Sequence, residues 1–554
     1  MNFLFVFVFF LIKVRDVTSV PIPLEGATKT SNEVETSGTE ETNNAEIRKV
    51  ILQHTNRLSD SDLVQIRDKL KKLNVNVRRS YDPSIISGVK VPERKNVVYD
   101  TEDGFKDVWE LNQKLTDYLY QSDILLTPAQ MDDILIDNSR QKRKAKASPD
   151  FKWSTSKPIP YVFDDYLAPI KKTAIENALK YWQDYTCVSF EYNAAGEDSL
   201  KFINGAGCYS NIGRITGQQE VSIGDGCEYL GITSHEVAHA LGFYHEQSRY
   251  DRDDFLSVNL TNVLPDMARN FDVGSPTDMN FYGIPYEYGS VMSYSSSSFA
   301  VDRNVPVIIP LDPLYLQSMG QRTGPTFLDI LEMNRHYGCL ALCKRSSIKC
   351  SRGGYPNPND CSKCICPAGF GGESCNERQP AQNANCGSEL HATDAWQELY
   401  GEIGGSKTVF PSVCTWHIIA PIDDRIEMRI TELNARCHSG CAHNALQVKT
   451  RRNVQPTGYR HCCKEDNRGH VYRTDTNVLP IIAEAFIHMN FTLEYRSISS
   501  SSTTARAIIV TANSFYKSKA AENGGQSIAP ASICFLLVYV SLVMQYNCKC
   551  ASHM

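Results

Sequence analysis

The sequence predicts a modular α+β protein, in which a mixed helix-and-strand domain is followed by a small disulfide-rich module and an all-β sandwich. Length is the first observation, because 554 residues are too many for one hydrophobic core and correspond to roughly three to five domains. All 19 cysteines lie at or after Cys187, which predicts disulfide-bonded modules in an oxidising compartment. Residues 386–497 alternate apolar and polar side chains, as in Trp416–Ala420 and Ile426–Ile430, which is typical of β-strands.

Composition and net charge limit the kinds of partner that the protein can bind. Hydrophobic residues make up 42% of the chain, charged residues 22%, and the net charge is −6, which are values of ordinary soluble globular proteins. The chain has no basic excess that would attract a polyanion. A nucleic-acid partner is therefore not expected.

The N-terminus predicts a signal peptide, residues 1–19. Phe3–Ile12 is a continuous apolar run that is too short to span a bilayer but fits a signal-peptide core. Lys13 and Arg15 follow this core instead of preceding it, so the alternative is an apolar segment that packs into the folded protein. The favoured reading is a secreted, extracellular protein.

Residues 20–143 are predicted to form a prosegment. Residues 27–45 carry few large apolar side chains, which predicts disorder. Helical spacing follows, in two sets: Leu63, Ile66, Leu70 and Leu73, then Phe105, Val108, Leu115 and Leu119. The basic run Arg140–Arg143 fits cleavage after Arg143 by a secretory processing protease, although a solvated basic surface would look the same.

Residues 144–339 have the length of a single domain. The pattern of Ile159–Phe163 predicts a strand, and the apolar face from Ile170 to Trp182 predicts a helix that packs on a sheet. Short strands also fit 188–192 and 200–203. This pattern predicts a mixed α+β core.

The most informative run in this domain begins at His235. On a helix, His235 and His239 lie one above the other and can reach one metal ion, and Glu236 lies beside them as a general base. Gly242 is suited to turning the chain where the helix ends, so that His245 can return as a third ligand. Two histidines alone would fit an ordinary surface helix. The third histidine favours a zinc site, since 13 histidines in 554 residues give this spacing by chance only roughly 0.007 times.

The run His-Glu-x-x-His-x-x-Gly-x-x-His resembles the extended zinc signature of the metzincins, and Glu246 directly after it resembles the nematode-type astacin family. Pro285–Tyr294 is similar to the Met-turn of that family. The block Gly207–Arg214 also resembles a segment of astacins. The resemblance implies that Met292 lies beneath the metal and that Tyr294 is a catalytic residue and an additional zinc ligand. Ser293 departs from the family, which more often has His there, but this change touches no ligand.

The resemblance implies a two-lobed catalytic domain with one Zn²⁺ in the cleft. It also implies a zinc metalloendopeptidase, made as a zymogen, that hydrolyses extracellular proteins of matrix or cuticle type through a zinc-bound water. Tyr120–Ile124 is similar to the family's prosegment motif, which makes Asp123 the group that occupies zinc in the zymogen, although Ser122 replaces the usual Gly. The alternative is that Asp123 is a solvent-facing loop residue. A thiolate switch is excluded because no cysteine precedes Cys187.

Two module types follow the catalytic domain. Cys364–Cys375 resembles the end of an EGF-like module, assigned to residues 340–376, with a zinc knuckle as the alternative. Residues 386–497 resemble a CUB domain in the segments around Cys414 and at Phe491–Tyr495. The resemblances imply six disulfides and leave the pairing of Cys437, Cys441, Cys462 and Cys463 open: Cys187–Cys339, Cys208–Cys227, Cys343–Cys361, Cys350–Cys364, Cys366–Cys375 and Cys386–Cys414.

The tail, residues 498–554, is rich in Ser and Thr and then apolar from Ile533 to Met544, which is too short for a standard membrane helix. Membrane attachment through a lipid-anchor signal is the less favoured reading of this tail. Asn259 and Asn490 begin glycosylation sequons, which function only where the asparagine is exposed.

Two rival functions fit part of the sequence. A catalytically silent extracellular protein could use the EGF-like and CUB modules only for binding, and loss of a ligand or of Glu236 would favour it. A different metzincin family is disfavoured by Glu246 and Tyr294. All the residues that hydrolysis requires are present.

Overall fold

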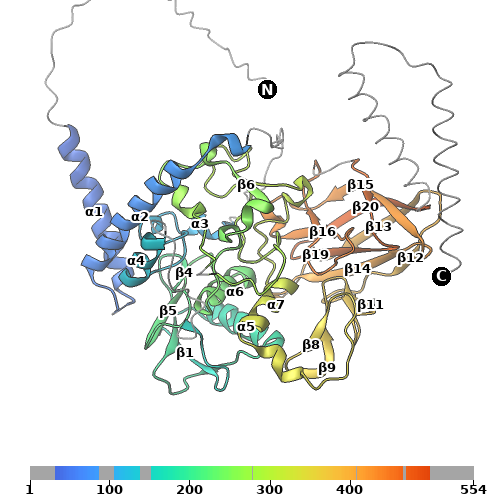
Figure 1. Ribbon diagram of the computed structural model, residues 1–554, viewed down its shortest axis with the longest axis horizontal. Helices are drawn as coiled ribbons and strands as arrows, with labels where there is room; N and C mark the ends of the chain where they lie inside the picture. The colour runs from blue at the N-terminus through green and yellow to red at the C-terminus, as the bar shows by residue number, and fades with distance from the viewer. Residues whose placement is uncertain are drawn as a thin grey trace, which may run out of the picture. The chain divides into compact units, whose positions relative to one another are not determined.

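The computed structural model describes residues 32–55, 57–86, 105–137, 151–276, 279–406, 408–465 and 469–499 (Figure 1). The described residues belong to two units, which divide between Lys49 and Val50. The predicted signal peptide, the cleavage site at Arg143 and residues 500–554 of the tail lie outside the described residues. No helix among the described residues is long and apolar enough to cross a membrane.

A helix, α1 (Asn32–Leu52), supplies the described part of the first unit. The prediction of disorder for residues 27–45 is therefore wrong from residue 32 onward. From Ala45 the chain consists of good helix formers such as Glu46, Lys49 and Leu52. Once such a turn has formed, adding residues is far easier than starting a helix, so the helix extends back through the polar stretch.

The second unit begins with the rest of the predicted prosegment. The first spacing set is confirmed, because Leu63, Ile66, Leu70 and Leu73 are buried on α2 (Asp60–Ser80), which begins with a Ser59 capping box. The second set does not form one helix. Only Val108 lies in a helix, α3 (Val108–Leu111), while Leu115 and Leu119 flank the short η2 (Thr116–Tyr118). The helix ends early because Asn112 follows α3 as its C-cap and turns its side chain to the main chain of Cys208. The short elements η1 (Pro83–Ile86) and α4 (Pro128–Asp137) complete this region.

A five-stranded sheet and two helices form the first half of the predicted catalytic domain. The strands β1 (Ile159–Phe163), β2 (Phe190–Tyr192), β3 (Ser199–Ile203), β4 (Cys208–Ser210) and β5 (Gln218–Ile223) have the order β2-β1-β3-β5-β4. All pairs are parallel except β4 with β5. The antiparallel β4 is last in the strand order and therefore forms one edge of the sheet. The helices α5 (Pro169–Tyr185) and α6 (Leu230–Ala240) pack together. The predicted strands and helix are confirmed, but Ile170, at the start of the predicted apolar face, is 66% exposed.

The second half of the predicted catalytic domain is mostly irregular. Its regular elements are β6 (Leu256–Val258), β7 (Ile308–Pro310), α7 (Phe327–His336) and the short 3-10 helices η4 (Glu246–Ser248), η5 (Arg252–Asp254), η6 (Leu260–Asn262), η7 (Ala268–Phe271) and η8 (Pro313–Tyr315). A separate apolar cluster that includes Phe271, Tyr294 and Phe299 packs beneath these loops. The disulfide Cys187–Cys339 joins the end of α5 to the end of this half, with Cα atoms 5.3 Å apart.

A small disulfide-rich segment follows α7. It contains η9 (Cys339–Cys343), β8 (Tyr355–Asn357), β9 (Asp360–Ile365), β10 (Phe370–Gly371) and β11 (Glu377–Arg378), paired as two short hairpins. Three disulfides cross it: Cys343–Cys361, Cys350–Cys364 and Cys366–Cys375. With few buried apolar residues of its own, the segment depends on these bonds.

We call the last part the C-terminal sandwich. One sheet has the order β12-β14-β19-β16-β17 and the other β13-β20-β15-β18, and one apolar cluster fills the space between them. Figure 1 shows these strands in orange. The elements are β12 (Glu389–His391), β13 (Gln397–Ile403), β14 (Ser412–Ile419), β15 (Asp424–Asn434), η10 (Ser439–Cys441), β16 (Asn444–Val448), β17 (Tyr459–His461), β18 (Tyr472–Arg473), β19 (Val478–Ala485) and β20 (Met489–Ser499).

The sandwich carries three disulfides. Besides Cys386–Cys414, the four cysteines that the sequence left open pair as Cys437–Cys463 and Cys441–Cys462. Two adjoining cysteines on one strand end thus hold the loop before β16 at two points.

The two predicted glycosylation sites differ. Asn259 is only 6% exposed, and its side-chain oxygen accepts hydrogen bonds from the main chain and hydroxyl of Thr261. It fails the condition of exposure, because a buried and engaged amide cannot carry a glycan. Asn490 is half-buried on β20, and its site stays a prediction.

Candidate active site

The helix α6 presents the two first histidines. His235 and His239 are one turn apart and fully buried. The helix ends at Ala240, and Gly242 has φ of 105°, a value that glycine adopts without strain. The chain then turns so that His245, 1% exposed, faces the first two histidines.

The three imidazoles and one carboxylate converge on a single point. The Nε2 atom of His235 lies 3.0 Å from that of His239 and 3.3 Å from that of His245. The carboxylate of Asp123 lies 3.2 Å from His235, 3.0 Å from His245 and 3.5 Å from His239. All four ligand atoms lie within 4.8 Å of one another.

The outer nitrogen of each ring is engaged by an oxygen. The Nδ1 atoms of His235 and His239 lie 2.8 Å from the carbonyl of Val291 and 2.6 Å from that of Phe243. The Nδ1 atom of His245 lies 2.9 Å from the side-chain oxygen of Gln121. Since carbonyl oxygens only accept, the outer nitrogens carry the protons and the inner lone pairs face each other. Three such nitrogens and a carboxylate oxygen fit the four-coordinate preference of zinc.

Burial sets the electrostatics of the site. It lowers the pKa of His235 to about 3, with the neighbouring His239 acting in the same direction, so that the ring is neutral as a metal ligand requires. For Asp123, burial acts to raise the pKa, but the surrounding histidines hold it well below the usual range. Burial, followed by the charge of Asp123, raises the pKa of Glu236 well above its usual value. Both carboxylate oxygens of Glu236 are buried and lack a hydrogen-bond partner among the described residues.

Asp123 reaches the histidines on a segment that lies along the sheet. Ile124 forms a parallel bridge with Ser210 of β4, and Ser210 donates its N–H to the carbonyl of Asp123 at 3.0 Å. Gln121 and Ser122 have φ of 47° and 68°. Serine is strained there, which explains why glycine is the usual residue before the aspartate in the motif that this segment resembles.

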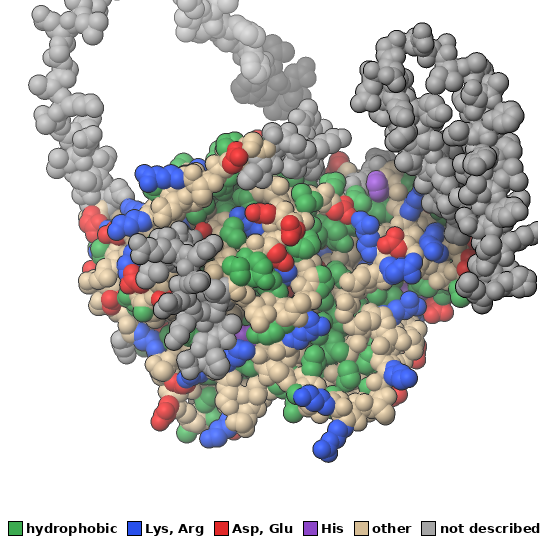
Figure 2. Space-filling view, in the orientation of Figure 1, with side chains coloured by type: hydrophobic (Ala, Val, Ile, Leu, Met, Phe, Trp, Pro, Cys, Tyr) green, Lys and Arg blue, Asp and Glu red, His purple; other side chains and the backbone are tan. Residues whose placement is uncertain are grey.

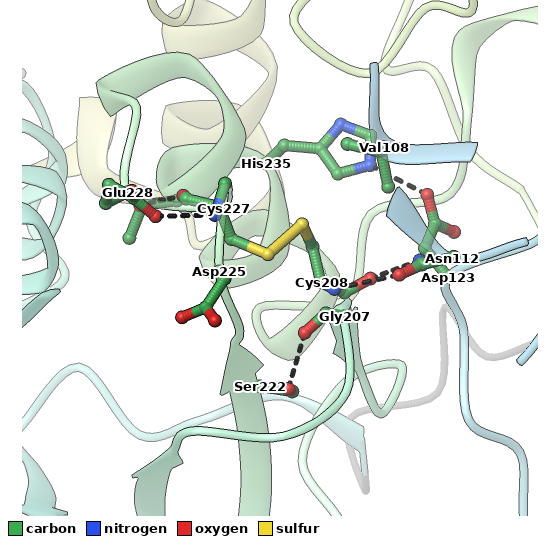
Figure 3. Close-up of a disulfide and its surroundings, with 12 residues drawn as sticks. Val108, Asn112, Asp123, Gly207, Cys208, Ser222, Asp225, Cys227, Glu228 and His235 are labelled. Carbon is green, nitrogen blue, oxygen red and sulfur yellow. Dashed lines mark hydrogen bonds and ion pairs between the residues drawn. A yellow bond between two sulfur atoms is a disulfide. The ribbon is translucent and has the colours of Figure 1, made fainter. Parts of the chain in front are cut away.

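Asn112 fixes the same segment from the other side, and nothing in the sequence pattern pointed to it. Its Nδ2 donates to the carbonyl of Ser122 at 2.9 Å, and its Oδ1 accepts from the N–H of Cys208 at 2.8 Å. Figure 3 shows Asn112 beside the Cys208–Cys227 disulfide, with Asp123 turned toward His235. Gln121 was also missed. Both residues act through contacts with residues distant in sequence.

Tyr294 and Met292 lie on the loop below the histidines. The ring of Tyr294 packs 4.6 Å from that of His245, and its hydroxyl donates to the carbonyl of Gln121. Met292 is 4% exposed and its carbonyl accepts the N–H of Glu246 at 3.1 Å. The hydroxyl of Ser293 donates to the carbonyl of Tyr294, away from the histidines.

Glu246 ties the histidine segment to this loop. Its Oε1 accepts from Arg249 at 3.1 Å and from the N–H of Glu287 at 2.9 Å. Burial raises the pKa of Glu246 to about 7. Two further residues hold the loop and were not foreseen: Asp329 accepts from Ser290 and from the N–H of Val291, and Arg322 donates to the carbonyls of Val291 and Ser293.

The two histidines of α6, the third beyond a glycine turn and the methionine loop below them place the protein among the zinc-dependent peptidases of the metzincin class. Comparison with known proteins narrows this class. The sequence model of the Astacin peptidase family matches residues 145–338.

Nematode relatives match over a longer stretch. Zinc metalloproteinase nas-31 of Caenorhabditis elegans is 36% identical over 403 residues, which cover 70% of this chain and 64% of that protein. Zinc metalloproteinase nas-29 of the same organism is 34% identical over 435 residues, 73% of this chain and 81% of that protein. Zinc metalloproteinase nas-32 is 36% identical, and the match covers 61% of its length. The chain thus spans less than two thirds of nas-31 and nas-32.

Among solved structures, high choriolytic enzyme 1, a hatching enzyme zinc-protease from Oryzias latipes, is 35% identical, with 35% of this chain and 94% of that chain covered and a TM-score of 0.31. The chain belongs to the astacin family of zinc metalloendopeptidases. Its metal is zinc.

Proposed function

We propose that this chain is a secreted zinc endopeptidase made as a latent precursor. The single observation that carries the proposal is the contact of Asp123 with all three histidines of α6 and its following loop. In this organisation residues 1–19 are the signal peptide, 20–143 the prosegment, 144–339 the peptidase domain, 340–376 an EGF-like module and 386–497 a CUB-like module. The tail, residues 498–554, follows without an assigned role.

His235, His239 and His245 hold the zinc ion. When bound, zinc supplies a Lewis acid that polarises a substrate carbonyl and lowers the pKa of water. Glu236 accepts a proton from the attacking water and passes it to the leaving amine. Its burial supports this role, because no hydrogen-bond partner among the described residues competes for the carboxylate.

Tyr294 supplies the second catalytic group. Its hydroxyl donates to Gln121 in the latent chain and becomes available when the prosegment leaves. From a ring that packs against His245, the hydroxyl can then donate to the oxygen that gains charge during attack. Met292, Gly242 and Glu246 shape the site: Gly242 turns the chain, and Glu246 joins the ligand loop to the Met-turn.

The prosegment blocks the site in three ways. Asp123 takes the open position among the histidines, Gln121 engages both His245 and Tyr294, and residues 124–125 pair with the edge strand β4. A peptide substrate needs the same edge, because an extended backbone can add to β4 as one more strand. Latency therefore ends only when this segment leaves.

Cleavage by a processing protease after Arg143 would separate the prosegment from the peptidase domain. Eight disulfides among the described residues support secretion, since such bonds persist in oxidising compartments. The substrates are extracellular proteins of matrix or cuticle type. On the face seen in Figure 2, acidic and basic side chains of the described residues are interspersed.

A binding-only role for the two C-terminal modules is the second candidate, and the site disfavours it. A protein released from catalysis has no need to keep Glu236, which lies buried and without a partner at a cost in stability.

The test replaces Asp123 by Ala in a chain that also carries Arg143→Gln, so that processing cannot release the prosegment. We expect the uncleaved variant to hydrolyse a fluorogenic peptide well above the Arg143→Gln background, because the carboxylate no longer fills the open position. The matched control is Asp117→Ala, which removes a prosegment carboxylate that pairs with Arg269 away from the histidines. An uncleaved Asp123→Ala chain as silent as its parent would show that latency has another cause.

A further inference from the structure

Phe105 of the prosegment lies in a cage of three rings. Its centroid is 5.2 Å from that of Tyr229, 5.2 Å from that of His443 and 5.7 Å from that of His438. All three contacts are edge-to-face, with interplanar angles of 80°, 73° and 85°. His438 and His443 also pack against each other at 4.7 Å. Such arrangements stabilise aromatic pairs beyond the burial of their area.

The cage has walls from two modules. Tyr229 is the N-cap residue of α6, the helix that carries His235 and His239. His438 and His443 lie on either side of η10 in the C-terminal sandwich. The prosegment thus contacts both the peptidase domain and the sandwich at one side chain.

The sandwich loop that carries the two histidines is firmly held. The disulfides Cys437–Cys463 and Cys441–Cys462 fix it at two points. Gly440, with φ of 70°, packs so closely on the peptidase domain that a Cβ there would clash with the carbonyl oxygen of Gly320. The loop that carries the two histidines is therefore held by contacts other than those with Phe105.

The residues after Phe105 continue the contact toward the catalytic loop. Asp107 pairs with Arg322 at 2.9 Å, and Arg322 donates to the carbonyl of Ser293 in the Met-turn. Trp109 packs against Phe299, with ring centroids 5.0 Å apart. From Phe105 to Asp123 the prosegment is thus attached at both ends.

We propose that Tyr229, His438 and His443 form an aromatic-binding site that holds Phe105 as a second anchor of the prosegment, so that the C-terminal sandwich takes part in keeping the peptidase latent. The inference rests on the proposed function, because it assumes that the prosegment is the inhibitor. Asp123 blocks the metal site, and the aromatic site keeps the segment that carries Asp123 from leaving. The chemical class that the site recognises is the aromatic side chain of a polypeptide.

The experiment is a double-mutant cycle in the uncleaved full-length chain carrying Arg143→Gln. Phe105→Ala is expected to raise peptide hydrolysis about tenfold to a hundredfold, because it removes three aromatic contacts from the closed state. His443→Ala should raise hydrolysis by a smaller factor. The double variant should be no more active than Phe105→Ala alone, since both changes break the same contact.

The control is Trp109→Ala, whose partner Phe299 belongs to the peptidase domain. Because Trp109 and His443 make no common contact, the factors by which Trp109→Ala and His443→Ala raise hydrolysis should multiply in the double variant. His443→Phe, which keeps an aromatic edge, should restore latency, and this covers the case in which His443→Ala fails to fold. Processed His443→Ala enzyme should keep the parental kcat, which separates latency from catalysis.

Independent effects of Phe105→Ala and His443→Ala, or unchanged latency in Phe105→Ala, would overturn the aromatic site. The result with Asp123→Ala distinguishes the two proposals. If that variant leaks while the Phe105 and His443 effects are independent, only the aromatic site fails. If Asp123→Ala stays silent, the proposed latency mechanism fails.

Discussion

Two sets of buried histidines occur in the described residues, three on α6 and the loop after it and four in the C-terminal sandwich, His417 among them, and the two sets are built differently. His235, His239 and His245 are 0–1% exposed, and their Nε2 atoms meet at 3.0–3.3 Å in two of the three pairs. In the C-terminal sandwich, His438, His443 and His461 are 0–7% exposed, and their rings pack by edges against other aromatic rings.

The difference shows that burial alone does not make a metal site. In the first set each outer nitrogen faces an oxygen, so the inner lone pairs face one another and require a cation between them. In the second set His461 faces the hydroxyl of Tyr472 at 3.1 Å, and its ring packs against the ring of that residue. Convergent lone pairs distinguish a ligand set from a packed core.

The largest effect is expected on the rate of hydrolysis, from a substitution of Glu236 beside the three histidines of the first set. Glu236→Gln keeps the three imidazoles and should therefore keep zinc, but it removes the carboxylate that accepts the proton. The rate of peptide hydrolysis by processed enzyme should fall about 10²–10⁴-fold. Zinc content measured by atomic absorption, together with turnover, checks this. Near-parental turnover in the variant would show that Glu236 is not the general base.

A smaller effect is expected from Tyr294→Phe, which removes one oxygen and leaves the ring packed on His245. Losing one donor to the developing oxyanion should lower kcat about 10²–10³-fold with KM nearly unchanged. The measurement requires a fully metallated, processed enzyme. A parental kcat would return Tyr294 to a packing role.

The smallest effect is expected on the stability of the C-terminal sandwich as the pH falls, and it comes from His461 of the second set. Burial lowers the pKa of His461 to about 3, below its unfolded value near 6.5. The unfolded chain therefore binds the proton first as the pH falls, and stability that is complete above pH about 6.5 is lost progressively toward pH about 3. At pH 5 the loss should be about 2 kcal/mol.

Urea unfolding of the parent and of His461→Gln at pH 7.5 and 5 measures this loss. Gln accepts the same hydrogen bond from Tyr472 but does not titrate, so the variant should lose less stability over this range. Equal losses in the two proteins would show that His461 is not the group responsible.

Sequence reasoning reached the contiguous parts of the site. His235, Glu236, His239 and His245 lie within one short run whose spacing carries its own geometry. Asp123 was named from a motif, and the structure brings it against the three histidines. Gln121 and Asn112 were missed, because Gln121 contacts His245 and Asn112 contacts Cys208, partners more than ninety residues away that no local pattern reveals.

The fold shows the same division. Local periodicity predicted α2, β1, β2, β3 and α5, but not β4, β5, β6, β7 or α7. The division between α3 and η2 was not predicted either, since a contact with Cys208 decides it. The pairing of Cys437 and Cys441 likewise depends on how the loop before β16 meets Cys462 and Cys463.

The pairing of the prosegment with β4 has a consequence for aggregation as well as for latency. An edge strand presents unpaired N–H and C=O groups to which a strand of another molecule can add, and this is a common route to aggregation. Here Ile124 and Leu125 of the same chain cover part of β4. In the proposed latent precursor this part of the edge is paired, and release of the prosegment would expose it to other chains.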